Sequence, residues 1–111
     1  MITLTAEFTM QPGKVDQALK LVHAVKVQSD TEQSGTLFYL VHRVLDRKRQ
    51  PTRTLLFYEC YRDKKALDAH LGSPSWKALI RKWKSCFEGT PADIVVTSLD
   101  RFAGFVRLDA P

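Results

Sequence analysis

The sequence predicts an α+β fold with the element order β-α-β-β-α-β and an antiparallel sheet. Three observations predict it: segments with the two-residue apolar period of strands, segments with the period of helices, and glycine or proline turns between them. A chain of 111 residues has room for one hydrophobic core. We therefore expect one domain over residues 1–111, with a core from about 2 to 106.

The first strand and helix follow from simple periodicities. Residues 2–10 alternate between apolar and polar side chains, which predicts a strand with one buried face. A Pro-Gly turn follows within residues 11–14. From Val15 to about Ser29 apolar residues recur at helical spacing, and the polar stretch that follows ends at Gly35.

Two further strands are expected at residues 36–44 and 54–61, separated by a charged loop that contains Pro51. Both strands are apolar on both faces, although a sheet in a lone small domain normally leaves one face to water. Alternation in the earlier strand places Leu37, Tyr39 and Val41 on one face and Phe38, Leu40 and His42 on the other.

A helix in two parts is expected next. Asp63 is a suitable N-cap for a short first part that ends at Gly72. Ser73-Pro74 restarts the helix with a serine cap and a proline in the first position. Residues 89–91 end the helix, and residues 93–105 predict a last strand, straight or bent. The apolar stripe of the second part consists of Trp76, Leu79, Ile80, Trp83 and Phe87.

This order is the split βαβ, or ferredoxin-like, arrangement. Two helices can cover only one face of a four-stranded sheet, and the other face is apolar here as well. An exposed apolar patch of that size is a liability. We therefore expect a second copy to pack sheet to sheet in a symmetric homodimer, with His42 at the interface.

The net charge of +5 raises the question of a nucleic-acid partner. No recognised nucleic-acid motif accompanies the basic residues, and the aromatic residues follow core spacing, so we expect none. Two interpretations of the basic residues remain: they form a rim that attracts a small anion, or they are simply a solvated face of the protein. No run of about 18 apolar residues predicts a membrane span. The basic groups are Arg43, Arg47, Lys48, Arg49 and Arg53 near the loop, and Lys77, Arg81, Lys82 and Lys84 on the helix.

Cys60 and Cys86 lack the spacing of a metal or redox motif, so we expect free thiols and a cytoplasmic protein. The three histidines lie far apart in the sequence without paired carboxylates, which gives no metal signature. No glycine-rich phosphate loop is present either. We expect neither a metal nor a cofactor.

A series of short motifs follows the predicted order of elements: Pro12-Gly13-Lys14, Glu32 before Gly35-Thr36-Leu37-Phe38-Tyr39, Phe57-Tyr58-Glu59-Cys60-Tyr61, Arg62-Asp63, Ala66-Leu67, Ala69-His70-Leu71 and Ser73-Pro74. In this order the motifs resemble the antibiotic biosynthesis monooxygenase (ABM) family over about residues 2–88. The resemblance implies a dimeric α/β barrel with a hydrophobic pocket between sheet and helices, and oxygenation of polycyclic phenols or quinols without metal, flavin or haem.

The sequence departs from the family's pattern at three points. The chain contains no asparagine, although an asparagine lines the pocket of the best-described oxygenases. Tyr61 replaces the tryptophan of the strand-end motif. Ile80 occupies the position of the iron-binding histidine in the haem-degrading branch, and an aliphatic side chain cannot ligate iron.

His70 is the main candidate for proton transfer, because an imidazole with a pKa near 6.5 suits neutral pH. The alternative is a core histidine that bonds a carbonyl group or Glu59. Glu59 is either a buried base or a structural partner of an arginine or a backbone amide, and Tyr61 is the third catalytic candidate. The candidates for substrate binding are Tyr39, Trp76, Phe57 and Leu67.

The leading hypothesis is a cofactor-independent monooxygenase that acts on an aromatic, polyketide-type phenol or quinol in secondary metabolism. One alternative is an isomerase, or another proton-transfer enzyme, on a phosphorylated or polyketide ketone. That branch of the family shares Tyr58, Glu59, Tyr61, Asp63 and His70 with this chain. The other alternative is a non-catalytic protein of the same fold that binds a ligand.

Overall fold

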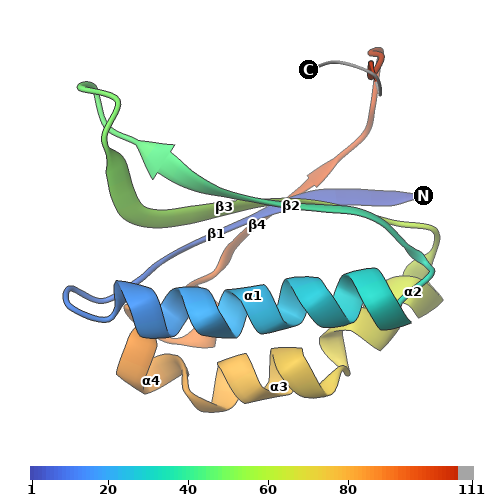
Figure 1. Ribbon diagram of the computed structural model, residues 1–111. Coiled ribbons are helices and arrows are strands. Elements are labelled where there is room, and N and C mark those ends of the chain that lie inside the picture. Colours follow the sequence, from blue (N-terminus) through green and yellow to red (C-terminus); the bar gives the residue numbers. More distant parts are fainter. Residues whose placement is uncertain (108–111) are drawn as a thin grey trace.

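The computed structural model describes residues 1–107; the last four residues of the expected domain lie outside this range. One antiparallel sheet in the order β2-β3-β1-β4 carries all its helices on one face (Figure 1). This confirms the ferredoxin-like fold. The elements are β1 Ile2–Thr9, α1 Val15–Glu32, β2 Thr36–Leu45, β3 Pro51–Tyr61, α2 Lys64–Leu71, α3 Pro74–Arg81, α4 Trp83–Cys86, the 3-10 turn η1 Pro91–Asp93 and β4 Val95–Leu99.

The core lies between the sheet and the helices. Phe8 on β1 stacks on Phe57 of β3 with ring centroids 4.9 Å apart. It also contacts Trp83 at 4.8 Å and Phe87 at 5.2 Å, which anchors the α4 end of the helical layer. Aromatic pairs at these distances add to the free energy gained by burying apolar surface. Trp83 is therefore a core residue at the α4 end of the helical layer.

The helix caps follow the sequence. The Asp63 carboxylate accepts a hydrogen bond from the Ala66 amide at 2.9 Å, and the Ser73 hydroxyl accepts one from the Trp76 amide at 3.4 Å. The same Ser73 hydroxyl donates to the His70 carbonyl at 2.7 Å. Both predicted caps are confirmed, and the second joins α3 to the end of α2.

Four expectations about element bounds need correction. Helix α1 runs on to Glu32, three residues beyond Ser29, and α3 and α4 meet at a break at Lys82. Strand β3 begins at Pro51, which is acceptable because the first residue of a strand need not donate to the sheet. The last strand ends at Leu99, and residues 100–107 leave the sheet.

The register of β2 against β3 shifts between Thr36 and Phe38, which marks a bulge at Leu37 that the sequence did not predict. Leu37 lies near Lys26 and Ser29 of α1, but its side chain is 43% exposed and does not join the core that Tyr39 and Val41 pack against.

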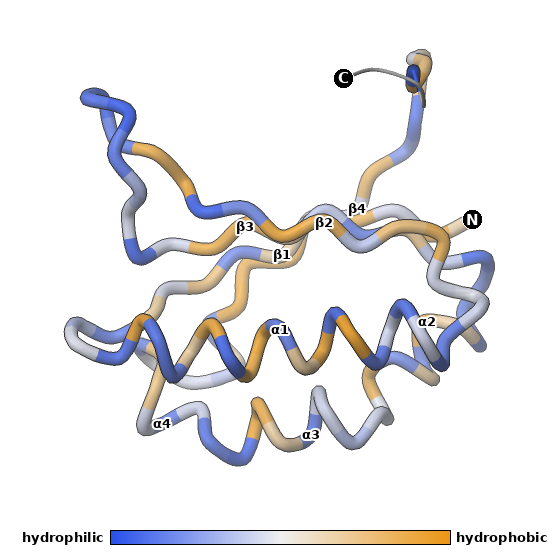
Figure 2. The backbone as a smooth tube through the Cα atoms, viewed as in Figure 1, coloured by the Kyte–Doolittle hydropathy of each residue, from blue (hydrophilic) through white to orange (hydrophobic). Residues whose placement is uncertain are grey.

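Within residues 1–107, no helix covers the other face of the sheet. Hydrophobic residues colour the central parts of the strands (Figure 2), and Phe38 packs against Tyr58 there with ring centroids 4.7 Å apart. Leu40 and Leu99 are 49% and 41% exposed. The β2–β3 hairpin and the segment after β4 both rise above this open face (Figure 1). In the described part of the chain, none of the helices has the length and apolar character to cross a membrane.

Gly35 allows the turn between α1 and β2 to approach α2 closely. A Cβ atom at this position would lie 2.5 Å from the Ala66 Cβ. We expect Gly35→Ala to lower the free energy of unfolding by about 1–3 kcal/mol, because the new methyl group overpacks this contact. Urea unfolding measures the effect.

A second change tests the cause. Ala66→Gly removes the opposing methyl group, so the double variant should lose less stability than the sum of the two single changes. Ala69→Gly, on the exposed side of α2, is the matched control and should combine additively with Gly35→Ala. Additivity in both pairs would contradict the steric explanation.

Candidate functional site

A cavity of about 310 Å³ lies between the sheet and the helices α2 and α3. Its walls are apolar or aromatic apart from two titratable side chains, Glu59 and His70. This combination of apolar walls and few polar groups is typical of sites for small molecules. The lining residues are Leu4, Ala6, Phe8, Tyr39, Phe57, Glu59, Leu67, His70, Leu71, Trp76, Pro91, Ile94 and Val96.

His70 occupies the last turn of α2 and is only 2% exposed. Aromatic rings surround it: the ring centroids of Tyr39, Tyr61 and Trp76 lie 5.2, 5.4 and 5.9 Å from its own. Burial lowers the pKa of His70 to about 4, because the charged form loses its hydration. The imidazole is therefore neutral at neutral pH and can accept a proton.

Two residues at the end of α1 contact the His70 ring on one side. Its Nδ1 atom lies 3.3 Å from the Ser29 hydroxyl and 3.2 Å from Gln33 Oε1. These contacts replace the carbonyl or Glu59 partner that the sequence suggested. Ser29 is buried on the same side of α1 as Val22 and Val25. A polar residue at the helical spacing of the buried residues was the signal in the sequence that could have identified Ser29 as part of the site.

Glu59 is buried in β3 and pairs with Tyr61, whose hydroxyl donates a hydrogen bond to Glu59 Oε1. Burial raises the pKa of Glu59, and the bond from Tyr61 opposes part of that rise. The expected arginine or amide partner is thus a tyrosine. Burial, reinforced by the Glu59 charge, also raises the pKa of Tyr61 and of Tyr39, so both phenols stay protonated donors.

The structure brings most of the predicted site residues to one cavity. Among the three catalytic candidates, His70 and Glu59 line it, whereas Tyr61 does not and lies behind Glu59. The four residues predicted for substrate binding all line it, namely Tyr39, Trp76, Phe57 and Leu67. Sequence reasoning missed the side of the cavity next to β4, formed by Pro91, Ile94 and Val96, because periodicity does not show which distant residues the start of the last strand will meet.

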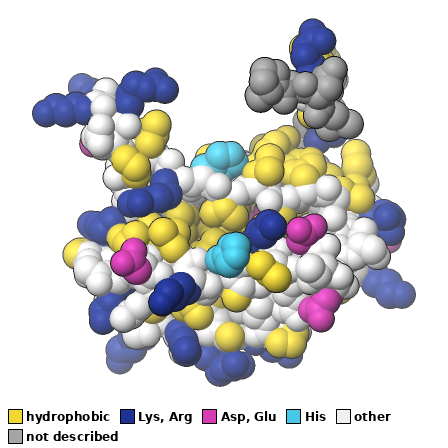
Figure 3. All heavy atoms as spheres, viewed as in Figure 1, with side chains coloured by type: hydrophobic (Ala, Val, Ile, Leu, Met, Phe, Trp, Pro, Cys, Tyr) yellow, Lys and Arg dark blue, Asp and Glu magenta, His cyan; other side chains and the backbone are white. Residues whose placement is uncertain are grey.

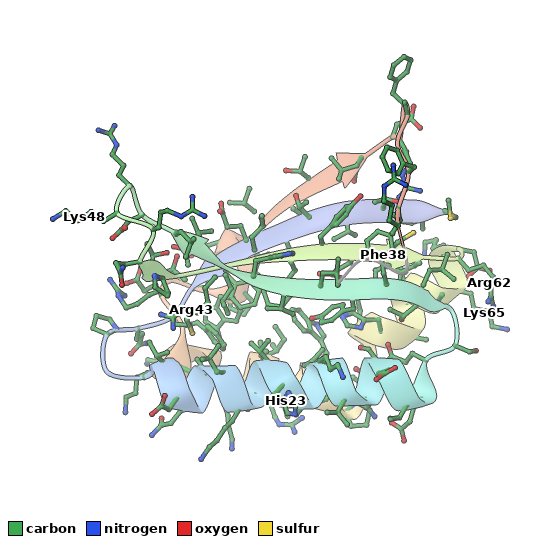
Figure 4. All side chains as sticks on the ribbon, turned by 45° about the horizontal axis from the view of Figure 1, so that its top comes forward. His23, Phe38, Arg43, Lys48, Arg62 and Lys65 are labelled. Carbon is green, nitrogen blue, oxygen red and sulfur yellow. The ribbon has the colours of Figure 1, made fainter. Side chains whose placement is uncertain are left out.

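Among the described residues, no lysine or arginine lines this cavity. Figure 4 shows Lys48 on the β2–β3 hairpin and Arg62 and Lys65 near the start of α2, all projecting outward. Figure 3 shows basic side chains spread over the surface of the molecule. The excess of basic side chains therefore lies on the surface of the protein. Basic side chains that are simply solvated fit this arrangement better than an anion-binding site in the cavity does. Within residues 1–107 no cluster of three metal-binding side chains occurs.

A larger hollow of about 610 Å³ lies at the other end of the sheet, but it is a more open groove. Its polar groups belong to exposed or half-buried residues such as Glu7, Thr54 and Glu88, and Glu88 already pairs with Arg53 at 2.7 Å. The smaller cavity is more enclosed and is lined by three side chains with shifted pKa values, Tyr39, Glu59 and His70. The cavity of about 310 Å³ is therefore the better candidate for an active site.

Comparison with known proteins identifies one family. A family model described as antibiotic biosynthesis monooxygenase matches residues 1–82. A comparison with curated proteins gives no match.

Solved structures give the same fold. A Pseudomonas aeruginosa protein is 24% identical with a TM-score of 0.75, covering 92% of this chain and 94% of its own. A candidate antibiotic biosynthesis monooxygenase from Bacteroides thetaiotaomicron is 12% identical with a TM-score of 0.77, covering 96% and 94%. A Mycobacterium tuberculosis protein is 20% identical with a TM-score of 0.73, covering 93% and 96%. At these identities the likeness shows the fold.

The buried neutral His70 makes stability depend on pH. Its pKa is about 4 in the folded protein and near 6.5 in the unfolded chain, so the unfolded state binds the proton first as the pH falls. Stability should therefore fall between about pH 6.5 and pH 4, by about 3 kcal/mol from this residue. Urea unfolding of wild type and of His70→Gln at pH 7 and pH 4 measures it.

The comparison isolates the effect of His70. The raised pKa of Glu59 changes stability in the opposite direction as the pH falls, but Glu59 is present in both proteins. His70→Gln should lack most of the acid-induced loss, and His23→Gln on the exposed side of α1 should keep it. An equal loss in His70→Gln would show that His70 titrates normally.

Proposed function

The chain belongs to the antibiotic biosynthesis monooxygenase family, and from this premise we propose that it oxygenates a phenol or quinol of the aromatic polyketide type. The observation that carries the proposal is a neutral histidine in an apolar cavity with aromatic walls. We further propose that the reaction needs no cofactor and serves secondary metabolism. We place it in the cytoplasm, where buried thiols such as those of Cys60 and Cys86 stay reduced.

The proposed chemistry begins with proton transfer from the phenol to His70. The phenolate then passes electrons from its ring to molecular oxygen, and a C–O bond forms at a ring carbon that carries hydrogen. The resulting peroxide takes the proton back from His70 and becomes a hydroperoxide. Loss of water from this hydroperoxide leaves a quinone. One oxygen atom ends in the product and the other in water, and the substrate supplies all the electrons. A dry cavity favours these steps, because charge interactions are strong where water is excluded.

The other cavity residues have supporting roles in this proposal. Tyr39, Phe57 and Trp76 would hold the aromatic ring of the substrate, and Leu67 would close the side next to α2. Glu59 would be a second acceptor for a hydroxyl group of the substrate. Tyr61 would act through Glu59, because its hydroxyl donates to that carboxylate and its side chain lies off the cavity wall.

A phosphorylated ketone fits this cavity poorly. Glu59 would face the phosphate, and no cationic side chain of the described chain lines the wall to offset its charge. Isomerisation of such a substrate is therefore the weaker alternative. A protein that only binds the ligand would consume no oxygen, which distinguishes this alternative from oxygenation.

Oxygen consumption tests the proposal. Purified protein with a chelator and no added cofactor should consume one O₂ per molecule of product on at least one member of a panel of hydroxylated naphthalenes and anthracenes. His70→Gln should lower kcat by about 10²-fold or more, the usual contribution of a general base. His23→Gln, exposed on α1 (Figure 4), is the matched control and should keep full activity.

Three outcomes would contradict parts of this proposal. Turnover that continues without oxygen would indicate isomerisation. Binding of the panel compounds without any turnover would indicate an accessory ligand-binding protein. Full activity of His70→Gln would remove His70 from the proton-transfer step.

We also propose that two copies pack through the open face of the sheet. This face carries Phe38, Leu40 and Tyr58, and the segment after β4 adds Phe102, which is fully exposed, and Phe105, which is 78% exposed. Burial of these side chains would be favourable by roughly 1.5–3 kcal/mol for each one fully covered. The hairpin and the segment after β4 flank the face (Figure 1), so a second copy would also contact them.

Sedimentation velocity tests the homodimer. Wild type should sediment at about twice the chain mass of 12.7 kDa. Leu40→Glu places a charge on the open face, next to Tyr58 of β3, and should give a monomer, because an unpaired charge in an interface is costly. Val27→Glu, at a similarly exposed position on α1, should stay dimeric. A wild-type monomer at micromolar concentration would overturn the proposal.

A further inference from the structure

The end of α1 contacts the imidazole of His70 on one side only. Ser29 in the last turns and Gln33 just after the helix both approach the Nδ1 atom, at 3.3 and 3.2 Å. Ser29 is buried and Gln33 is half-buried. Neither residue lines the cavity, so neither contacts a ligand there.

The Gln33 side-chain oxygen receives two contacts. Besides the His70 Nδ1 atom, the Thr36 hydroxyl donates to the same Oε1 at 3.3 Å. An amide oxygen only accepts hydrogen bonds, and it has two lone pairs to do so. A hydrogen bond from His70 to this oxygen therefore needs the proton on Nδ1.

The other ring nitrogen has different surroundings. His70 Nε2 has no hydrogen-bond partner in the described part of the chain. If Nε2 were completely buried, it would be a buried polar atom without a partner, but among the described residues only Ser75 Oγ is such an atom. Nε2 is consequently not sealed inside protein atoms, and His70 lines the cavity. Nε2 is the nitrogen that a ligand in the cavity can reach.

We propose that Gln33, assisted by Ser29, is a positioning residue that holds His70 as the Nδ1-protonated tautomer and directs the Nε2 lone pair into the cavity. The tautomer assignment stands on the contacts alone, and its catalytic consequence rests on the proposed function. A neutral imidazole can accept a proton only at the unprotonated nitrogen. The orientation of Gln33 thus decides whether the base faces the substrate.

Nuclear magnetic resonance tests the tautomer without any substrate. In ¹⁵N-labelled wild type at pH 7, long-range proton–nitrogen correlations should show His70 protonated at Nδ1. The His70 signals are those that vanish in His70→Gln. Gln33→Leu removes the acceptor and should shift His70 toward the Nε2-protonated form. Gln33→Glu keeps an oxygen acceptor and should retain the proton on Nδ1.

Gln28→Leu is the matched control. Gln28 is also a half-buried glutamine of α1, but its Oε1 accepts a bond from the Ser75 amide at 2.9 Å and makes none to His70. This variant should leave the His70 tautomer unchanged. Backbone amide spectra confirm that each variant is folded.

The kinetic readout separates positioning from binding. With a substrate from the oxygen-consumption panel, Gln33→Leu should lower kcat by about tenfold or more with little change in KM, and Gln33→Glu should recover part of the loss. Gln28→Leu should match wild type.

Two results would overturn the positioning role. In the first, wild-type His70 carries its proton on Nε2, which would mean that the Ser29 hydroxyl donates to Nδ1. In the second, Gln33→Leu leaves an Nδ1-protonated His70 unchanged. If the tautomer is as expected but no panel compound consumes oxygen, the proposed function fails and the positioning of His70 stands.

Discussion

A buried, neutral imidazole is the group on which the helical side of this protein depends. His70 is almost inaccessible to solvent, so each of its polar atoms needs a protein partner or the cavity. Ser29 and Gln33 meet this need on one side, which requires the end of α1 to lie against α2. Gly35 makes that approach possible, because a larger residue would collide with Ala66. The turn from α1 into β2, the docking of α2 and the state of His70 are thus one connected arrangement.

The two faces of the sheet have different degrees of cover. On the helical face the aromatic cluster around Phe8 fills the space near α4, whereas the space near α2 stays hollow and forms the cavity. The cap at Ser73 joins α2 to α3 and so fixes two walls of the hollow at once. On the open face Phe38 and Leu40 of β2 lie beside Tyr58 of β3, and Leu99 of β4 is also exposed. The fold keeps an internal space for a small ligand and an external surface suited to a larger partner.

The sequence predicts those features that depend on near neighbours in the chain. The alternation of β1, the caps at Asp63 and Ser73 and the place of His70 before Gly72 are all local signals, and the structure confirms them. The bulge at Leu37 and the early end of β4 arise from pairing between strands, which periodicity does not show. The same holds for the site: His70 was visible, but its contact with Gln33 joins residues 37 positions apart. Tyr61 was a catalytic candidate on the same strand face as Glu59, but it does not line the cavity, because alternation gives a face and not a depth.

The shifted pKa values bear on the proposed proton transfer. Burial disfavours the charged form of each group, so it raises the pKa of Glu59 and lowers that of His70. A lone imidazolium would be unstable there, which at first argues against His70 as a base. Proton transfer from a bound phenol, however, creates an imidazolium and a phenolate side by side, and their attraction is strong in a medium of low dielectric constant. The low pKa then describes the empty cavity, and the substrate itself supplies the counter-charge that makes His70 basic enough to act.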